Sequence, residues 1–179
     1  MALITLITGG ARSGKSSFAL RLALEKGKVR TFIATAVAFD EEMAERISRH
    51  QKERGDRFRT VEEPIHLSDA IGGLPADNQV VVVDCLTVWL GNLYHHYKED
   101  RNRVLTHVQA FINRLDDLAC DLILVTNEVG WGIVPESPLA RSFRDVAGYL
   151  NRRVAEKAQH VYLLCCGIPL TLKGSSTYE

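Results

Sequence analysis

The segment LITLITGGARSGKSS, residues 3–17, decides how this chain is organised. It begins with an apolar run that includes β-branched Thr5 and Thr8 and predicts a strand. Residues 9–16 then match the pattern G-x-x-x-x-G-K-[ST] at every fixed position, and residues 17–24 are good helix formers. A strand, a glycine-rich loop and a helix in this order predict a phosphate-binding loop. The alternative is a tight turn that happens to hold glycine and lysine.

The residue types of this loop suit the phosphates of a nucleotide. Gly9, Gly10 and Gly14 allow positive φ angles and a close approach of the backbone to a ligand. N–H groups at the start of the following helix bind anions, and Lys15 places a positive charge between the phosphates. The Ser16 hydroxyl is suited to hold Mg²⁺. The loop therefore predicts a nucleotide site with a magnesium ion.

The composition is that of an ordinary globular protein. Of the 179 residues, 46% are hydrophobic and 25% are charged, which favours one nucleotide-binding domain over residues 1–179. Lys plus Arg and Asp plus Glu number 22 each, and this zero net charge argues against a long nucleic acid as partner. Because no signal sequence or membrane-length apolar run is found, we expect a cytoplasmic protein without stable membrane insertion. Its cysteines are expected to be reduced, with Cys165 and Cys166 buried.

Apolar and amphipathic segments alternate along the rest of the chain. Residues 80–84, VVVVD, lack alternation, as in a strand of a parallel sheet that is covered on both faces. The other predicted strands are residues 29–36, 57–61, 121–126, 161–166 and 168–172. The predicted helices are residues 41–54, 65–71, 85–97, 100–118 and 139–158, and residues 174–179 are expected to be a loose tail. This order predicts an α/β fold, a mainly parallel sheet with helices on both faces.

Ligands bind at the carboxyl ends of the strands in such a sheet, so the residues that follow each strand are candidate site residues. They are Thr35, Ala36, Glu62, Asp84, Asn127 and Glu128. Asp84 ends the most apolar strand, where a carboxylate is typical of the second magnesium partner; its alternative role is to cap the next helix. Residues 126–128 are expected near the γ-phosphate. The loop that follows them is either a lid over the substrate or an ordinary surface loop.

His50 is a candidate nucleophile with two open interpretations. On a helix it shares one face with Met43 and Ile47, which is typical of a buried structural histidine. Its neighbours also include several basic residues, namely Arg46, Arg49, Lys52 and Arg54. Such surroundings favour a neutral, nucleophilic imidazole and suit a phosphate.

Two further groups of polar residues have less specific patterns. Arg141, Arg144 and Asp145 lie within a turn of one predicted helix and either contact phosphate or form an ion pair. Adjacent side chains on a helix diverge, so His95 and His96 make a poor metal site, and we expect them to be exposed or at an interface.

Five segments together resemble the bifunctional adenosylcobinamide kinase and adenosylcobinamide-phosphate guanylyltransferase family of cobalamin biosynthesis. They are TGGARSGKS at 8–16, DEEMAERISRHQ at 40–51, DCLTVWLGNL at 84–93, TNEVGWGIVPESPLARSFRDVAGYLNRRVAE at 126–156 and GIPLTLK at 167–173. The resemblance covers essentially the whole chain. The phosphate loop is shared by many families, whereas NEVGWGIVPE and RISRH are far more specific.

The resemblance implies a P-loop, RecA-like transferase that forms homo-oligomers, trimers among them. It first moves the γ-phosphoryl group of ATP or GTP to adenosylcobinamide. It then transfers GMP from GTP to adenosylcobinamide phosphate through a GMP–histidine intermediate. His50 matches the histidine of the family's RIxxH pattern and, with Lys15, is the expected catalytic residue.

The resemblance also supplies the expected ligand contacts. The nucleotide contacts are Gly9, Gly10, Ala11, Arg12, Ser13, Gly14, Lys15, Ser16, Ala34, Thr35, Ala36, Gln51, Lys52, Glu53, Arg54, Glu62 and Asp84. Ser16 and Asp84 are the expected Mg²⁺ ligands. Two alternatives remain: a monofunctional P-loop kinase with a structural His50, and a RecA-like NTPase module that acts on a partner. Zero net charge and the lack of an appended domain count against the second alternative.

Overall fold

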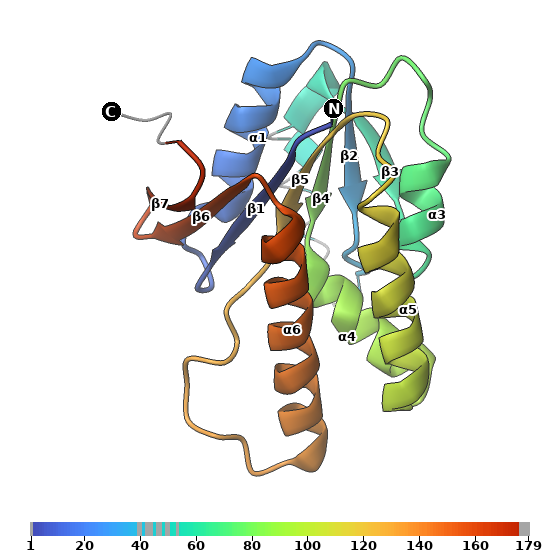
Figure 1. Cartoon of the computed structure of the whole chain (residues 1–179), viewed down its shortest axis with the longest axis vertical. Helices are drawn as coiled ribbons and strands as arrows, with labels where there is room; N and C mark the ends of the chain where they lie inside the picture. The colour runs from blue at the N-terminus through green and yellow to red at the C-terminus, as the bar shows by residue number, and fades with distance from the viewer. Residues whose placement is uncertain are drawn as a thin grey trace.

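The computed structural model describes residues 2–38, 41, 45, 48, 51–52 and 54–175. Their strands form one sheet in the order β3-β2-β4-β5-β1-β6-β7 (Figure 1). The strands are β1 (Ile4–Gly9), β2 (Arg30–Ala34), β3 (Arg59–Glu62), β4 (Val80–Asp84), β5 (Asp121–Val125), β6 (His160–Cys165) and β7 (Ile168–Lys173). The helices are α1 (Lys15–Lys26), α3 (Leu67–Gly72), α4 (Leu86–His96), α5 (Arg101–Arg114), α6 (Pro138–Lys157) and the 3-10 turn η1 (Gly55–Arg57).

The pairings confirm a mainly parallel sheet. Each described pair of neighbouring strands is parallel except β6 and β7, which form an antiparallel hairpin. Helices lie on both faces: α1 packs on one face, and α3, α4, α5 and α6 pack on the other. In Figure 1 the long helices α5 and α6 stand side by side in front of the sheet.

The unbroken apolar run of β4 is explained by its place between two helical layers. Val81 and Val83 point into the core under α3 to α6, whereas Val80 and Val82 belong to the core under α1. The first four residues of β4 are all fully buried. No polar alternation develops because neither face of this strand meets water.

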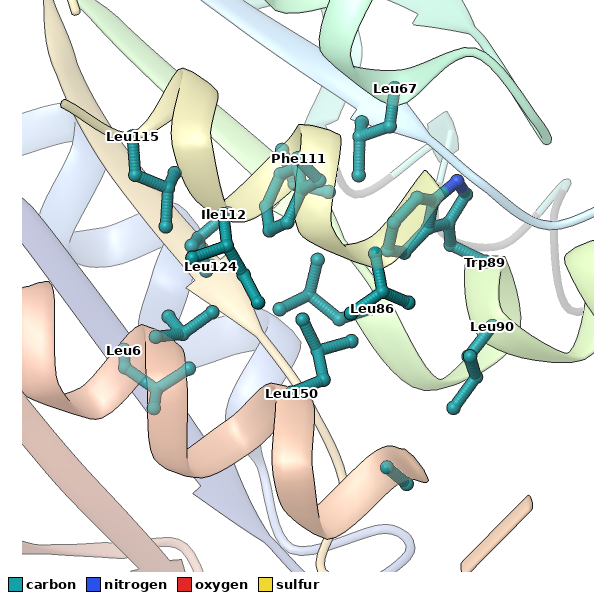
Figure 2. Close-up of a cluster of buried hydrophobic side chains, with 14 of the residues drawn as sticks. Leu6, Leu67, Leu86, Trp89, Leu90, Phe111, Ile112, Leu115, Leu124 and Leu150 are labelled. Carbon is teal, nitrogen blue, oxygen red and sulfur yellow. The ribbon is translucent and has the colours of Figure 1, made fainter. Parts of the chain in front are cut away.

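The larger core lies between the sheet and helices α4 to α6 (Figure 2). Trp89 and Phe111 pack with their ring centroids 5.2 Å apart, beside Leu86, Ile112 and Leu124. Trp89 also donates a hydrogen bond from Nε1 to the Ile65 carbonyl at 2.8 Å. The indole is therefore buried with its one polar atom satisfied, as a core tryptophan requires.

Several element boundaries differ from the sequence prediction. The strand expected over residues 29–36 spans Arg30–Ala34, and the next residue, Thr35, bonds through its hydroxyl to the backbone of Cys85. The helix expected over residues 100–118 ends at Arg114, where i to i−3 hydrogen bonds tighten the last turn. Of the helix expected over residues 41–54, the described positions 41, 45, 48, 51, 52 and 54 are helical, and the others lie outside the described residues.

The prediction that Cys165 and Cys166 are buried is wrong. Both are exposed, because they stand at the tip of the β6–β7 hairpin, where Cys166 adopts a φ of 54° and Gly167 a φ of 82°. β7 is an edge strand, and its apolar side chains Ile168, Leu170 and Leu172 are also exposed. An apolar run here forms a surface strand and not a core strand.

Among the described residues, no helix combines the length and apolarity needed to cross a bilayer.

Candidate functional site

The strand order brings the carboxyl ends of the six parallel strands of the described chain, β1 to β6, to one edge of the sheet. Val125 at the end of β5 is paired with Ile7 of β1 on one side and with Asp84 of β4 on the other. Ala34 at the end of β2 lies between Asp84 and Glu62 in the same manner. The phosphate-binding loop, residues 126–128, Asp84 and Glu62 therefore follow one another along this edge.

The phosphate-binding loop adopts a conformation that its glycines make possible. Gly9 has a φ of 146°, and a Cβ there would lie 2.4 Å from the Leu164 carbonyl oxygen. Gly14 has a φ of 93° at the start of α1, where its added Cβ would lie 3.3 Å from Gly167 Cα. Side chains at these two positions would be strained and crowded, which explains the choice of glycine. Gly10, Ala11, Arg12 and Gly14 are exposed, so the loop is open to a ligand.

Lys15 lies beneath this loop. It is 7% exposed, and its Nζ donates to the Gly10 carbonyl and, at 3.3 Å, to Ser13 Oγ. Ser16, on the first turn of α1, is half-buried. The lysine charge and the helix start are thus both directed at the loop that the sequence predicted to hold phosphates.

Asp84 is held at the sheet edge by the residues around it. The residue that follows, Cys85, donates its N–H to Thr35 Oγ1 at 2.7 Å, and the same hydroxyl donates to the Cys85 carbonyl at 2.9 Å. Asn92 Nδ2 donates to the Thr35 carbonyl at 2.7 Å. The cap of α4 is the Cys85 Sγ, which accepts from the Val88 N–H, so the capping role considered for Asp84 is filled by its neighbour. Asp84 itself is half-buried at the carboxyl end of β4.

Burial and the nearby Asp84 carboxylate raise the pKa of Cys85 to about 12. Cys85 is therefore a neutral thiol in the folded protein at physiological pH.

A polar network joins the ends of β1, β4 and β5. Thr8 Oγ1 donates to Glu128 Oε1 at 2.6 Å, and Asn151 Nδ2 donates to the same oxygen at 3.2 Å. Thr126 Oγ1 donates to Asn151 Oδ1 at 2.7 Å and lies 3.2 Å from Thr87 Oγ1. The sequence pattern indicates Thr126 and Glu128 as site residues but does not indicate their partners Thr8, Thr87 and Asn151. Their signal is weak, since threonines at strand ends and one asparagine in a helix are common.

The remaining predicted nucleotide contacts include both exposed and buried side chains. Gln51 and Lys52 are exposed on the helical segment, and Glu62 is exposed at the end of β3. Arg54 is 3% exposed, with its guanidinium carbon 4.0 Å from the centre of the Phe32 ring, so it packs into the core under α1. His50 and Glu53 lie outside the described residues.

Thr35 is fully buried and its hydroxyl is occupied by the Cys85 backbone. Ala34 and Ala36 are half-buried beside it. At this position only the backbone and the small neighbouring side chains are available to a ligand.

The loop between β5 and α6 carries exposed apolar side chains. Trp131 is 72% exposed and Ile133 is 96% exposed. Arg141 closes the loop by donating from Nη1 to the carbonyls of Pro135 and Glu136. In Figure 1 this orange loop leaves the sheet at the edge where the strands end and runs to the start of α6.

The arginines of α6 were expected either to contact phosphate or to form an ion pair. Arg144 forms an ion pair, in which its Nη2 lies 3.0 Å from Asp145 Oδ1. His95 and His96 are exposed, as expected. No group of three or more His, Cys, Asp or Glu residues suited to a metal ion is found in the described part of the chain. A magnesium ion here would instead have the hydroxyl and carboxylate ligands typical of nucleotide sites.

Comparisons with known proteins identify relatives of the whole chain. A family described as "Cobinamide kinase / cobinamide phosphate guanyltransferase" (CobU) matches residues 5–172. The chain is 42% identical to the bifunctional adenosylcobalamin biosynthesis protein CobP of Pseudomonas aeruginosa, over 94% of this chain and 96% of that protein. It is 39% identical to the bifunctional adenosylcobalamin biosynthesis protein CobU of Escherichia coli, over 96% of this chain and 100% of that protein.

Among solved structures, the RadB recombinase matches with a TM-score of 0.53 at 18% identity, over 90% of this chain and 73% of that chain. This likeness concerns the fold alone and agrees with the expected RecA-like P-loop architecture.

Proposed function

We propose that this chain, which belongs to the cobinamide kinase / cobinamide phosphate guanyltransferase family, is a bifunctional transferase of cobalamin biosynthesis. We also propose which of its residues serve each of the two reactions. The family match over residues 5–172 is the observation that carries this function. The two reactions are phosphorylation of adenosylcobinamide with ATP or GTP and transfer of GMP from GTP to adenosylcobinamide phosphate, which gives adenosylcobinamide-GDP.

For the kinase reaction, the phosphate-binding loop and Lys15 hold the nucleotide. Phosphoryl transfer depends mainly on positioning and on neutralising the charge of the transferred group. Lys15 supplies a positive charge, and the exposed backbone of residues 10–14 supplies N–H donors. Nucleotide binding replaces the bond from Lys15 Nζ to the Gly10 carbonyl with bonds to phosphate oxygens.

Ser16 and Asp84 are suited to hold the magnesium ion. A serine hydroxyl at the start of α1 and a carboxylate at the end of β4 are hard oxygen ligands at one edge of the sheet. When bound, Mg²⁺ neutralises charge on the β- and γ-phosphate oxygens.

For the guanylyl transfer, His50 is the proposed nucleophile. The support is the match of residues 46–50, RISRH, to the family pattern that carries the guanylylated histidine. A histidine nucleophile splits nucleotidyl transfer into two displacements. In the first, a bond forms between an imidazole nitrogen and the α-phosphorus and pyrophosphate leaves; in the second, the phosphate of adenosylcobinamide phosphate displaces the imidazole. Gln51, Lys52, Glu53 and Glu62 are the proposed further nucleotide contacts, and Arg54 would join them only after its guanidinium leaves the Phe32 ring.

The proposed enzyme is a cytoplasmic homo-oligomer, because its nucleotide substrates are made inside the cell and because its relatives by resemblance include trimers. The exposed apolar residues Ile168, Leu170 and Leu172 of β7 support an association of copies, since monomers seldom expose such patches.

The function is tested by incubating the purified protein with Mg²⁺, GTP and adenosylcobinamide and separating the corrinoid products. We expect adenosylcobinamide phosphate first and adenosylcobinamide-GDP later. Phosphorylation without the second product would favour the monofunctional kinase. ATP hydrolysis that DNA or RNA stimulates, without any corrinoid product, would favour the RecA-like NTPase module.

A further inference from the structure

We propose that Glu128 is the general base that accepts the proton of the acceptor hydroxyl in the kinase reaction. The proposal rests on the proposed function, because it concerns how one of the two reactions is catalysed. It is carried by the position of Glu128 in the sheet and by the hydrogen bonds that hold its carboxylate.

The strand order places Glu128 beside the phosphate-binding loop. β5 lies between β1, which leads into that loop, and β4, which ends at Asp84. The ladder with β1 continues past β5, since the Thr126 N–H donates to the Ile7 carbonyl and the Glu128 N–H donates to the Gly9 carbonyl. Glu128 is thus hydrogen-bonded to the first residue of the phosphate-binding loop. In the proposed site the γ-phosphate lies between this loop and the carboxylate at the end of β4.

Glu128 differs in chemistry from the other residues at this place. The side chains that bond its carboxylate are the Thr8 hydroxyl and the Asn151 amide, and the hydroxyls of Thr126 and Thr87 follow along the same network. None of these groups accepts a proton near neutral pH, whereas a carboxylate does. The other carboxylate of this edge, Asp84, is the proposed magnesium ligand.

A chain of side-chain hydrogen bonds leads to the Glu128 carboxylate, and Asn151 Nδ2 also donates to the Asn127 carbonyl at 3.1 Å. The Asn127 N–H donates to Thr87 Oγ1 at 2.8 Å. Thr126 Oγ1 has one proton and donates it to Asn151. In the contact between Thr126 and Thr87, the Thr87 hydroxyl is therefore the donor. Asn151 then donates to Glu128 Oε1, and Thr8 donates to the same oxygen. Within the described part of the chain both bonds go to Oε1, which leaves Oε2 to a substrate hydroxyl.

This network positions the carboxylate before substrate binds. Thr126 is 1% exposed, Thr8 is 5% exposed and Asn151 is 8% exposed, so the supporting groups are shielded from water while Glu128 is half-buried. Hydrogen bonds in such surroundings hold a catalytic group in one orientation. Thr8 and Asn151 are positioning residues in this account.

In the proposed step, the acceptor oxygen forms a bond to the γ-phosphorus while the bond from that phosphorus to the β,γ-bridging oxygen breaks. The hydroxyl proton passes to Glu128 Oε2, and the nucleoside diphosphate leaves with the electron pair of the broken bond. The second reaction needs no such base. Its nucleophile is a phosphate monoester, which is already largely ionised near neutral pH.

The two reactions therefore provide the test. Glu128→Gln is compared with wild type for phosphorylation of adenosylcobinamide and, separately, for guanylyl transfer to preformed adenosylcobinamide phosphate. We expect the kinase kcat to fall about 10²–10⁴-fold, the usual contribution of a positioned base, while guanylyl transfer and the KM for nucleotide stay near the wild-type values. Glu136→Gln, an exposed glutamate of the same loop, is the matched control and should keep both activities.

A Glu128→Gln variant that keeps wild-type kinase activity would overturn the proposal, and so would an equal loss of both activities, which indicates a purely structural role. Thr8→Val should lower the kinase kcat by a smaller factor and again spare guanylyl transfer. Failure of the proposed function looks different, because wild type itself would then form neither corrinoid product.

Discussion

Thr35 and Cys85 join the carboxyl ends of β2 and β4 through one shared hydroxyl. Thr35 Oγ1 accepts the Cys85 N–H at 2.7 Å and donates to the Cys85 carbonyl at 2.9 Å. The Thr35 N–H also donates to the Asp84 carbonyl at 3.2 Å. The two peptide groups that flank Cys85 are thereby fixed, one of which is the peptide that follows Asp84, so this buried threonine helps to set where the proposed magnesium ligand stands.

Replacement of Thr35 by valine should destabilise the protein and weaken nucleotide binding. The shapes match, but the buried Cys85 N–H loses its partner, whereas the Cys85 carbonyl keeps the Trp89 N–H at 3.1 Å. An unsatisfied buried polar group costs about 1–3 kcal/mol, which should appear as a lower midpoint of urea unfolding. The matched control is Thr60→Val, at an exposed position of β3, whose effect should stay within about 0.5 kcal/mol. Equal stabilities of the two variants would refute the role given to Thr35.

Lys15→Ala should abolish γ-phosphoryl transfer. The variant loses the charge that lies beneath the phosphate-binding loop, so we expect kcat to fall by at least about 10²–10³-fold, as when another preorganised electrostatic group is removed. The kinase assay with adenosylcobinamide measures this, and Lys28→Ala, at an exposed lysine after α1, serves as control. Near-normal turnover in Lys15→Ala would refute the assignment of the loop.

The cysteines should separate by reactivity under native conditions. Cys165 and Cys166 are exposed, whereas burial and the Asp84 carboxylate raise the pKa of Cys85 to about 12. Because the thiolate is the reactive form, Cys85 should react with a neutral-pH thiol reagent only after unfolding. The contact with Cys166 also raises the pKa of Cys165, so the rate at the hairpin should increase with pH.

The thiol experiment has a direct control. The double variant Cys165→Ser and Cys166→Ser should lose the fast phase of the reaction. A fast phase that survives in this variant would mean that Cys120, which is half-buried, or Cys85 is open to the reagent.

Much of the fold could be predicted because its signals are local. The apolar run of residues 80–84 and the motif of residues 9–16 each specify an element without reference to distant residues, and β4 has the predicted bounds. The exposure of Cys165 and Cys166 could not be predicted from the apolarity of their segment. Whether an apolar strand is covered depends on its place in the sheet, and β7 lies at the edge.

The polar network of the site could not be predicted from the sequence either, because it also depends on the strand order. Thr8 and Glu128 are 120 positions apart in the chain, and nothing near either residue indicates that they meet. Only the strand order, with β5 inserted between β1 and β4, places them together. Motifs that contain catalytic or binding residues can be recognised in the sequence. The residues that orient them are brought into place by the strand order of the sheet.

One measurement tests most directly whether this protein is a bifunctional enzyme with His50 as the guanylylated residue. The protein is incubated with Mg²⁺ and GTP labelled at the α-phosphate, without corrinoid, and protein-bound label is measured after denaturation. We predict label that is acid-labile and alkali-stable, absent in His50→Ala and retained in His66→Ala, an exposed histidine of the described chain. An absence of label in wild-type protein that still binds GTP, or its retention in His50→Ala, would contradict the account.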